Sequence, residues 1–440
     1  MTTISRSFLF SAQRILVVAA LSALWFAEIE AADYTVLRGA EREWPHAVLV
    51  VPLPPHGQSI GIADQISTLP IERGTLTIVE TDGAPDPGDI AESLAGAGAS
   101  GENRPDWLWI HYGAVSKGDE VAQALIRLAG NDAETLEAAL ETALDSESAF
   151  AFDVPDRIVS LSGEGVATFE YPRRTPLSRQ VRHTRQLAVA LLREAGMISP
   201  EVDFEWERLG RRAGRLVALY DADGTGGSGP GSLERIVDAT IENAGIYRVC
   251  GEDIRDGALG PAATSIFPGG SGRGIGTGLQ ASGRKALDDY IASGGGYLGV
   301  CAGAYFAGSG LDVYLHAVNL SHSPPWRRGR GMVEIELTSE GKKLFGNERT
   351  VLETRYANGP VFLPEDQEGG GDPDFVVLAT FKTPSTDPDG IVREEMVGQA
   401  AIGSRTYGDG RILVISPHPE SHAEHDAFVG RAISWTMGPD

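Results

Sequence analysis

In the C-terminal half of the chain, short apolar runs recur between stretches whose apolar residues follow helical spacing. The runs predicted as strands are 215–220, 247–250, 263–267, 296–300, 332–337, 375–381 and 412–416, and the predicted helices are 233–244 and 283–292. Strands alternating with helices of this length predict a parallel sheet that is covered by helices on both faces. This half is therefore predicted to be a mostly parallel α/β domain over 215–438.

The N-terminal half also predicts an α/β domain, over 33–199, followed by a linker at 200–214. Its predicted strands are 47–53, 75–80, 107–111 and 166–171, its predicted helices are 119–129, 133–144 and 178–195, and 83–105 is predicted as a loop rich in Gly, Pro and Ala. A chain of 440 residues is also too long for one ordinary core. We therefore expect two domains.

The first 31 residues have the pattern of a targeting segment. Arg6 and Arg14 supply positive charge, an apolar run occupies 15–27, and small residues follow at Ala31 and Ala32. The apolar run is shorter than the roughly 20 residues that a membrane-spanning helix needs. Residues 1–31 are therefore predicted to be a cleaved signal peptide of a secreted or periplasmic protein, with a retained N-terminal anchor as the alternative.

The charge of the chain excludes one class of partner. Acidic residues outnumber basic residues by 61 to 37, which gives a net charge of -24. This charge repels phosphate backbones, so we expect no nucleic acid partner. A small molecule or a peptide is the expected substrate or ligand, no cofactor is expected, and the oligomeric state is left open.

The strongest chemical signal is the segment 299–303 (GVCAG), which lies between an apolar strand and a short helical stretch. A strand, a tight turn and a helix form the context in which a nucleophile is presented at the edge of a sheet. Cys301 occupies the turn, where the helix N-terminus favours the thiolate. The alternative is a small buried cysteine in a Gly-rich crossover. Cys250, the other cysteine, ends a different predicted strand, so a disulfide is not expected.

A second candidate group follows the last predicted strand. His418 and Glu420 lie two residues apart, just beyond the C-terminal end of that strand, where catalytic groups of parallel sheets gather. His418 would accept the proton of Cys301, and Glu420 would orient the imidazole. The alternative is an ordinary surface loop.

The third candidate is the turn formed by 267–270 (FPGG). Backbone N–H groups of Gly269 and Gly270, together with that of Ala302, are predicted to form an oxyanion hole. The alternative is an ordinary tight turn. The glycine-rich run that continues over 271–278 lacks the Lys-Ser/Thr ending of a nucleotide-binding loop, so it matches that motif only weakly.

Four segments in this order carry a family resemblance: PGG, GGGYLGVCAGAYFA, RYANGPVF and SPHPESH. They resemble the class I glutamine amidotransferase-like superfamily, in the branch found at the N-terminus of eukaryotic biotin-protein ligases, over about 215–438. The resemblance implies a flavodoxin-like sheet with Cys301, His418 and Glu420 as a catalytic triad. It also implies that Gly270 and Ala302 hold the oxyanion, but it does not imply ligase activity.

The N-terminal half is similar, through PHG at 55–57, RGTL at 73–76 and WIH at 109–111, to zinc carboxypeptidase-like succinylglutamate desuccinylases and aspartoacylases. The resemblance implies His56 and His111 as metal ligands and Glu170 as the catalytic glutamate. Ser59 stands where this family has a glutamate ligand, so we expect weak or absent zinc binding and treat these residues as vestigial. In the alternative interpretation they are ordinary loop and strand-end residues.

These features predict an exported hydrolase of amides or related acyl compounds that uses Cys301, His418 and Glu420. A non-catalytic module that binds a small molecule or peptide on the same fold is one alternative, and a cell-envelope cysteine peptidase is another. The loops at 321–331 and 383–394 are predicted to determine which substrate is bound.

Overall fold

The computed structural model describes residues 33–39, 41–54, 56–81, 107–114, 124–129, 150–153, 165–171, 175–210, 214–227, 229–318, 320–322, 329–346, 348–364 and 374–439. The predicted signal peptide, the predicted loop at 83–105 and the predicted helix at 133–144 lie outside these residues. Contacts divide the chain into a first unit of Met1–Leu53, Pro70–Arg173 and Gln186–Val202 and a second unit of Pro54–Leu69, Arg174–Arg185 and Asp203–Asp440. Two segments expected in the first domain, 54–69 and 174–185, therefore belong to the second unit.

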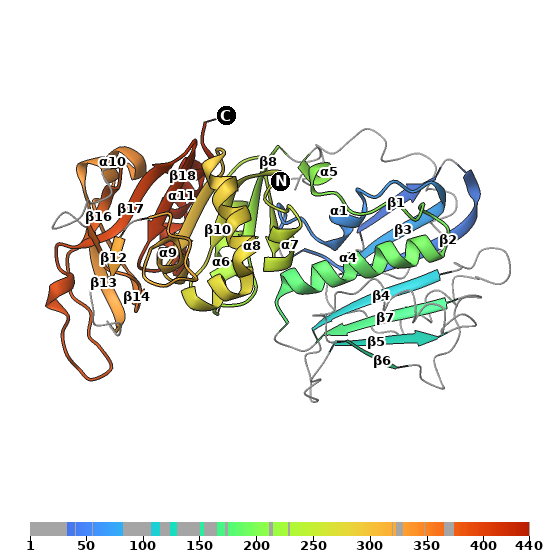
Figure 1. Cartoon of the computed structure of the whole chain (residues 1–440), viewed down its shortest axis with the longest axis horizontal. Coiled ribbons are helices and arrows are strands. Elements are labelled where there is room, and N and C mark those ends of the chain that lie inside the picture. The colour runs from blue at the N-terminus through green and yellow to red at the C-terminus, as the bar shows by residue number, and fades with distance from the viewer. Residues whose placement is uncertain are drawn as a thin grey trace, which may run out of the picture. The chain divides into compact units, whose positions relative to one another are not determined.

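The first unit contains a seven-stranded sheet in the order β1-β3-β2-β4-β7-β5-β6 (Figure 1). Its strands are β1 (Asp33–Arg38), β2 (Glu41–Pro52), β3 (Arg73–Thr81), β4 (Trp107–Ala114), β5 (Ala124–Ala129), β6 (Phe150–Asp153) and β7 (Gly165–Tyr171). The β3-β2-β4-β7 part is parallel, whereas β1 and β5 pair antiparallel with their neighbours β3 and β7. The four strands predicted in this half are present.

One prediction in this unit was wrong. The segment 119–129 was expected to be a helix, but Ala124–Ala129 is the strand β5. β5 pairs antiparallel with β7 from Leu125↔Glu170 to Ala129↔Val166, and parallel with β6 on its other side. Pairing along both edges of a strand outweighs the weak helical spacing of its apolar residues, because strand preference depends on tertiary context.

The long helix α4 (Leu177–Glu194) was predicted from its apolar spacing, and its end was predicted at Gly196. Gly196 has φ of +66°, and its N–H donates to the Arg193 carbonyl while the Met197 N–H donates to Leu192. A left-handed glycine that closes the last turn in this way is a common helix ending.

The second unit contains an 11-stranded sheet whose main path runs β14-β13-β16-β17-β18-β11-β10-β8-β9. Five strands, β9, β8, β10, β11 and β18, pair in parallel, as the strand and helix alternation predicted. The strands are β8 (Arg215–Tyr220), β9 (Ala244–Val249), β10 (Ala262–Phe267), β11 (Gly296–Val300), β12 (Leu320–His322), β13 (Arg330–Leu337), β14 (Val351–Ala357), β15 (Phe362–Pro364), β16 (Val376–Phe381), β17 (Ala400–Tyr407) and β18 (Gly410–Ile415). The strands β17, β16, β13 and β14 extend this sheet beyond β18, and their antiparallel pairing was not predicted.

Helices cover both faces of the parallel strands (Figure 1). The helices of the second unit, besides the first part of α4, are α1 (Ile62–Ile66), α5 (Trp206–Gly210), α6 (Gly229–Thr240), α7 (Gly251–Arg255), α8 (Gly272–Ala292), α9 (Ala302–Ala307), α10 (Ser339–Phe345) and α11 (Asp426–Met437), with 3-10 turns at Glu394–Met396, Pro419–Ser421 and Ala423–His425. Successive residues of β8 enter opposite apolar cores: Leu216 packs with residues of α8 and α9, and Val217 packs with residues of α6 and α11. This alternation confirms the predicted α/β class, with a sheet buried on both sides.

The N-terminal end of α8 differs from the prediction, because the helix begins at Gly272 and not at 283. Ser271 is its N-cap, and the Ser271 hydroxyl accepts a hydrogen bond from the Gly274 N–H. Glycine has a low helix propensity. The glycine-rich run could therefore not be recognised from propensity as the first turns of α8. The run at 271–278 that looked weakly like a nucleotide loop therefore forms the N-cap and first turns of α8, and the helix is interrupted after this run, at Gln280, where φ is 59°.

Among the described residues, none of the helices combines the length and the apolar character that crossing a bilayer requires.

The end of β10 and the helix α9 can approach each other closely because residue 303 is a glycine. A Cβ placed on Gly303 would lie 2.0 Å from the Phe267 carbonyl oxygen, and backbone cannot move aside cheaply. Gly303→Ala is therefore expected to lower the free energy of unfolding by about 1–3 kcal/mol or more, measured by urea-induced unfolding. Gly231→Ala is the matched control, because a Cβ there meets no atom within 4 Å. Equal stability of the two variants would contradict the close approach.

Candidate active site

Cys301 lies between the parallel strand β11 and the helix α9, at the C-terminal edge of the sheet. Its backbone has φ of 51° and ψ of -97°, a conformation that non-glycine residues rarely adopt. The turn is held because the Cys301 N–H donates to the Ile415 carbonyl at 2.8 Å, and the Tyr305 N–H donates to the Cys301 carbonyl at 3.0 Å. Strain of this kind, fixed by surrounding structure, is typical of functional positions.

His418 and Glu420 follow β18, the strand next to β11 in the sheet. The His418 N–H donates to the Arg355 carbonyl at 2.7 Å, which joins this segment to β14. The Nδ1 atom of His418 is 2.7 Å from Oε1 of Glu420, and the two side chains are 9% and 4% exposed. The carboxylate therefore fixes the ring orientation through one nitrogen and leaves the other for a different partner.

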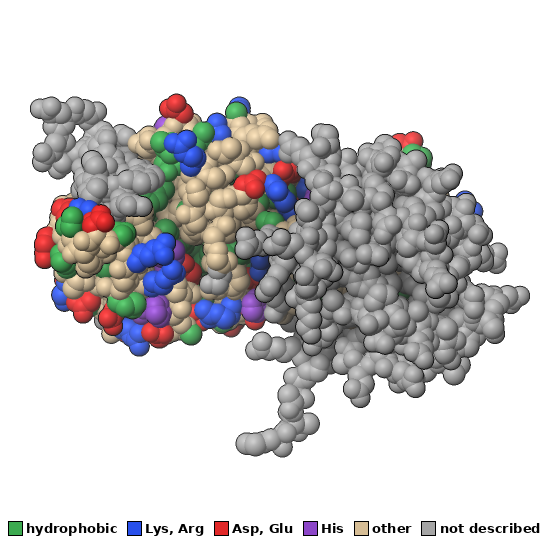
Figure 2. All heavy atoms as spheres, turned by 90° about the horizontal axis from the view of Figure 1, so that it is seen from below, with side chains coloured by type: hydrophobic (Ala, Val, Ile, Leu, Met, Phe, Trp, Pro, Cys, Tyr) green, Lys and Arg blue, Asp and Glu red, His purple; other side chains and the backbone are tan. Residues whose placement is uncertain are grey.

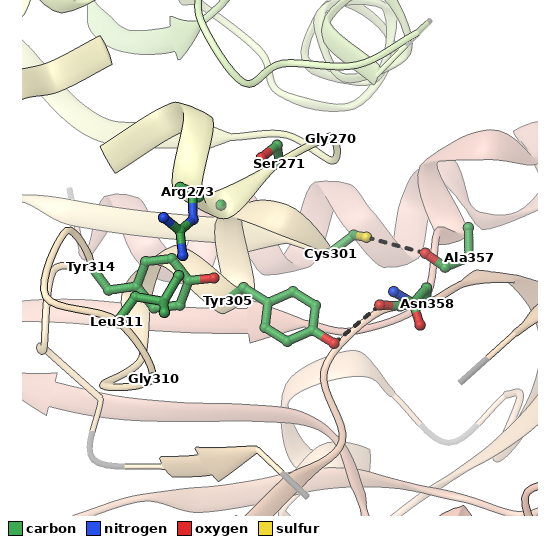
Figure 3. A pocket seen from close by; sticks show the side chains of 11 residues that line it. Gly270, Ser271, Arg273, Cys301, Tyr305, Gly310, Leu311, Tyr314, Ala357 and Asn358 are labelled. Carbon is green, nitrogen blue, oxygen red and sulfur yellow. Dashed lines mark hydrogen bonds between the residues drawn. The ribbon is translucent and has the colours of Figure 1, made fainter. Parts of the chain in front are cut away.

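Cys301 and His418 approach each other beside Gly269. A Cβ on Gly269 would lie 2.7 Å from Cε1 of His418 and 3.6 Å from Cβ of Cys301, so only glycine fits between them. The thiol also contacts the Ala357 carbonyl at 3.7 Å (Figure 3). The structure thus brings together the three residues that were predicted as a triad.

The electrostatics of the site favour a protonated imidazole. Burial alone would lower the pKa of His418, but its hydrogen bonds to Cys301 and Glu420, and the charges of both partners, raise that pKa to about 10. His418 therefore carries a positive charge at neutral pH, next to the sulfur and the carboxylate.

The predicted oxyanion residues are close to Cys301: Gly269 lies beside its Cβ, Gly270 lines the same pocket, and Ala302 is the next residue in the chain. Gly270 has φ of +143° and forms an antiparallel β-bridge with Thr225. The hydrogen bonds of this bridge come from neighbouring residues: the Gly226 N–H donates to the Gly269 carbonyl, and the Ser271 N–H donates to the Gly224 carbonyl. Among the described residues, the Gly270 N–H does not donate to a backbone carbonyl. The Ala302 N–H is the first of α9, so it has no acceptor within its helix.

A pocket of about 490 Å³ opens over Cys301 (Figure 3). Its lining residues are Gly270, Ser271, Gly272, Arg273, Cys301, Tyr305, Gly310, Leu311, Tyr314, Ala357 and Asn358. This volume falls in the range of sites for small molecules. The sulfur is thus accessible to a small ligand, although Cys301 as a whole is only 6% exposed.

Sequence reasoning missed much of the pocket wall. Tyr305 and Asn358 lie within two of the segments that carried the resemblance, but Tyr314 lies in a turn with no such signal. Asn358 has φ of +58°, and its carbonyl accepts a hydrogen bond from the Tyr305 hydroxyl at 3.1 Å. An asparagine followed by glycine was the available hint of a left-handed turn there.

The predicted specificity loop at 383–394 is not part of the pocket lining. Its backbone instead bonds within itself, from the Arg393 N–H to the Ser385 carbonyl, and bridges β13 from Thr386 to Arg330. Most of the other loop, 323–328, lies outside the described residues.

The four positions considered for zinc are distributed over both units. The Ser59 hydroxyl donates to Oε1 of Glu234 at 2.6 Å within the second unit, so it already has a carboxylate partner there. His111 lies within β4 and Glu170 within β7, both in the first unit, whereas His56 belongs to the second. Among the residues described, no group of three or more His, Cys, Asp or Glu could hold a metal ion.

Both cysteines are free. Cys250 is fully buried at the N-terminus of α7, where its thiol lies 3.1 Å from Oδ2 of Asp253. Burial, and then the negative charges of Asp253 and Glu252, raise the pKa of the Cys250 thiol. Cys250 therefore lies beside a carboxylate that disfavours its thiolate, whereas Cys301 lies beside the imidazole of His418.

Similar folds exist among solved structures, each aligned with about half of this chain. A cytoplasmic protein from Salmonella typhimurium has a TM-score of 0.34 and 10% identity, with 98% of that protein and 50% of this chain covered. PurLQS from Thermotoga maritima has a TM-score of 0.35 and 11% identity, covering 99% of that chain and 50% of this one. A glutamine amidotransferase from Thermotoga maritima has a TM-score of 0.32 and 14% identity, covering 82% of that chain and 50% of this one.

No curated protein matched the sequence. The model of one family, described as biotin-protein ligase, N terminal, matches residues 259–319. This range includes the FPGG turn, the Cys301 turn and α9. Over these residues the chain is similar to the N-terminal domain of biotin-protein ligases, which confirms the resemblance that the sequence segments indicated.

Proposed function

We propose that the protein is an exported, cysteine-dependent hydrolase of amides or related acyl compounds, with Cys301 as the nucleophile. The observation that carries the proposal is the contact of His418 with Glu420 at 2.7 Å on one side and with the Cys301 thiol on the other. A cysteine paired with an oriented imidazole is the arrangement that acyl transfer to sulfur requires.

In the first step, the Cys301 thiolate attacks the carbonyl carbon of the substrate, and the carbonyl oxygen becomes an oxyanion. We assign the stabilisation of this charge to the N–H groups of Gly270 and Ala302, because an oxyanion requires hydrogen-bond donors of this kind. The tetrahedral intermediate then expels the amine, which takes a proton from the His418 imidazolium, and a thioester on Cys301 remains.

In the second step, a water molecule attacks the thioester. Neutral His418 accepts a proton from this water while its oxygen bonds to the acyl carbon. The carbon–sulfur bond breaks, which releases the carboxylic acid and restores the thiolate and the imidazolium. Glu420 keeps the ring orientation in both steps and stabilises its positive charge.

The test is hydrolysis of a panel of small amides and thioesters by the purified protein. Release of amine or thiol is expected, together with an acyl adduct on the peptide containing Cys301 when the reaction is quenched in acid. Cys301→Ala should show neither. Hydrolysis that survives in Cys301→Ala would refute the proposed nucleophile, and ligand retention without any turnover or adduct would favour a binding module.

A further inference from the structure

We infer that Tyr297 is a positioning residue of the active site: its hydroxyl holds the Gly303 carbonyl and, through Gly303, sets the spacing of the two N–H groups assigned to the oxyanion. The inference rests on the proposed function, because it gives a role in the same reaction to a residue that does not line the pocket. It depends on a buried hydrogen bond, a ring stack and the link that Gly303 makes between two segments of the site.

The hydrogen bond comes from the strand that leads to Cys301. Tyr297 lies in β11 and is fully buried, and its hydroxyl donates to the Gly303 carbonyl in the first turn of α9 at 2.7 Å. Burial raises the pKa of Tyr297 well above its ordinary value. The hydroxyl therefore stays protonated at neutral pH and remains a donor to α9.

Gly303 joins the two segments that supply the assigned oxyanion donors. Its N–H donates to the Pro268 carbonyl at 3.1 Å, in the turn that continues to Gly270. Ala302, which carries the other donor, is the residue directly before Gly303. A shift of Gly303 would therefore move the FPGG turn relative to the start of α9 and alter the spacing of the N–H groups of Gly270 and Ala302.

The ring of Tyr297 packs against the residue that opens the FPGG turn. The rings of Tyr297 and Phe267 are stacked, with centroids 5.1 Å apart and planes at 19°, and Phe267 packs in turn on Phe306 of α9 at 5.6 Å. On another side, a Cβ added to Gly299 would lie 2.8 Å from Cε1 of Tyr297, so the ring has little room to move. One side chain therefore contacts both segments, the turn through its ring and the helix through its hydroxyl.

Two reactions of the same sulfur separate this role from activation of the thiol. Acylation by p-nitrophenyl acetate forms a bond between sulfur and the acyl carbon and passes through an oxyanion, before the carbon–oxygen bond breaks and nitrophenolate leaves. Alkylation by iodoacetamide forms a bond between sulfur and the methylene carbon while the carbon–iodine bond breaks, and no oxyanion develops. Both reagents are uncharged, so the acidic and basic side chains interspersed on the visible face of the second unit (Figure 2) attract neither of them selectively.

Tyr297→Phe keeps the ring and removes the hydroxyl. It is expected to slow acylation of Cys301 by p-nitrophenyl acetate about tenfold at pH 7, and to change alkylation by iodoacetamide by less than about twofold. The effect on acylation is smaller than the roughly 10²–10³-fold loss caused by deleting an oxyanion donor, because the donors are displaced and not removed. Acylation is measured as the release of nitrophenolate, after subtraction of the rate of Cys301→Ala.

Tyr247→Phe is the matched control. Tyr247 is also fully buried, and its hydroxyl donates to the Ala258 carbonyl at 2.5 Å, but neither residue lines the pocket. The variant loses an equivalent buried hydrogen bond, so a general loss of stability would affect both variants alike. Tyr247→Phe should react with both reagents at wild-type rates.

Three results would overturn the inference: wild-type acylation by Tyr297→Phe, equal slowing of acylation by Tyr247→Phe, or slowing of acylation and alkylation by the same factor in Tyr297→Phe. Both rates come from one sample, so partial unfolding lowers them together and does not imitate the expected result. A wild type that releases nitrophenolate no faster than Cys301→Ala would refute the proposed function, and the inference with it. This failure appears without any change at Tyr297, so the two failures are distinguishable.

Discussion

Replacing His418 by alanine is expected to slow iodoacetamide labelling of Cys301 roughly 100-fold at pH 6.5. An ordinary thiol, with a pKa of about 8.5, is about 1% ionised at that pH, and the variant loses the positive charge that His418 places beside the sulfur. The pKa of His418 is raised, so its charge is fully present below the ordinary value of 6.5 and is lost only as the pH rises through about 10. The charge of His418 should therefore be present from pH 6.5 to 9, and the wild type should react faster than His418→Ala at pH 6.5.

The rate of His418→Ala should be lowest at pH 6.5 and should rise with pH as an ordinary thiol becomes ionised. Glu420→Gln should have a smaller effect, because the carboxylate acts through the imidazole and is not in contact with the sulfur. Equal labelling rates of the wild type and His418→Ala at pH 6.5 would show that the imidazole does not activate the thiol.

Substituting Gly269 by alanine is expected to reduce both Cys301 labelling and amide hydrolysis by about 10²-fold or more. The added Cβ would lie 2.7 Å from Cε1 of His418, so the ring must move away from the sulfur. A displacement of a general base or acid by about 1 Å lowers the reaction rate by a factor of about this size. The measurement is the labelling rate at pH 6.5, with circular dichroism to establish that the variant is folded.

Gly231→Ala serves again as the control, because a Cβ there meets no neighbouring atom and the residue lies outside the pocket lining. It should label at the wild-type rate. A folded Gly269→Ala protein with wild-type reactivity would mean that the imidazole and the thiol do not depend on their close approach.

The central part of the second unit could be predicted from sequence because its signals are local. The apolar runs of β8, β10, β11 and β18 are short, and each contains β-branched or aromatic residues. Cys301 could be singled out because glycines flank it between a strand and a helix, which is where backbones approach closely.

The parts that could not be predicted depend on contacts between distant segments. β5 is a strand because β6 and β7 pair with it, and nothing within Ala124–Ala129 specifies those partners. Likewise, the FPGG turn, the Cys301 turn and residues near Asn358 meet only in the folded chain, so the pocket wall could not be assembled from spacing. Ser59 illustrates the same limit, because its partner Glu234 lies 175 residues away.

The most direct test of the central claim compares the two cysteines in one sample. Cys301 lines the pocket beside a protonated His418, whereas Cys250 is fully buried beside Asp253, which with burial raises its pKa. Iodoacetamide at pH 6.5, followed by peptide mass spectrometry, should therefore modify Cys301 at least about 100-fold faster than Cys250 in the folded protein. Equal labelling of both residues, or faster labelling of Cys250, would contradict the assignment of Cys301 as a nucleophile.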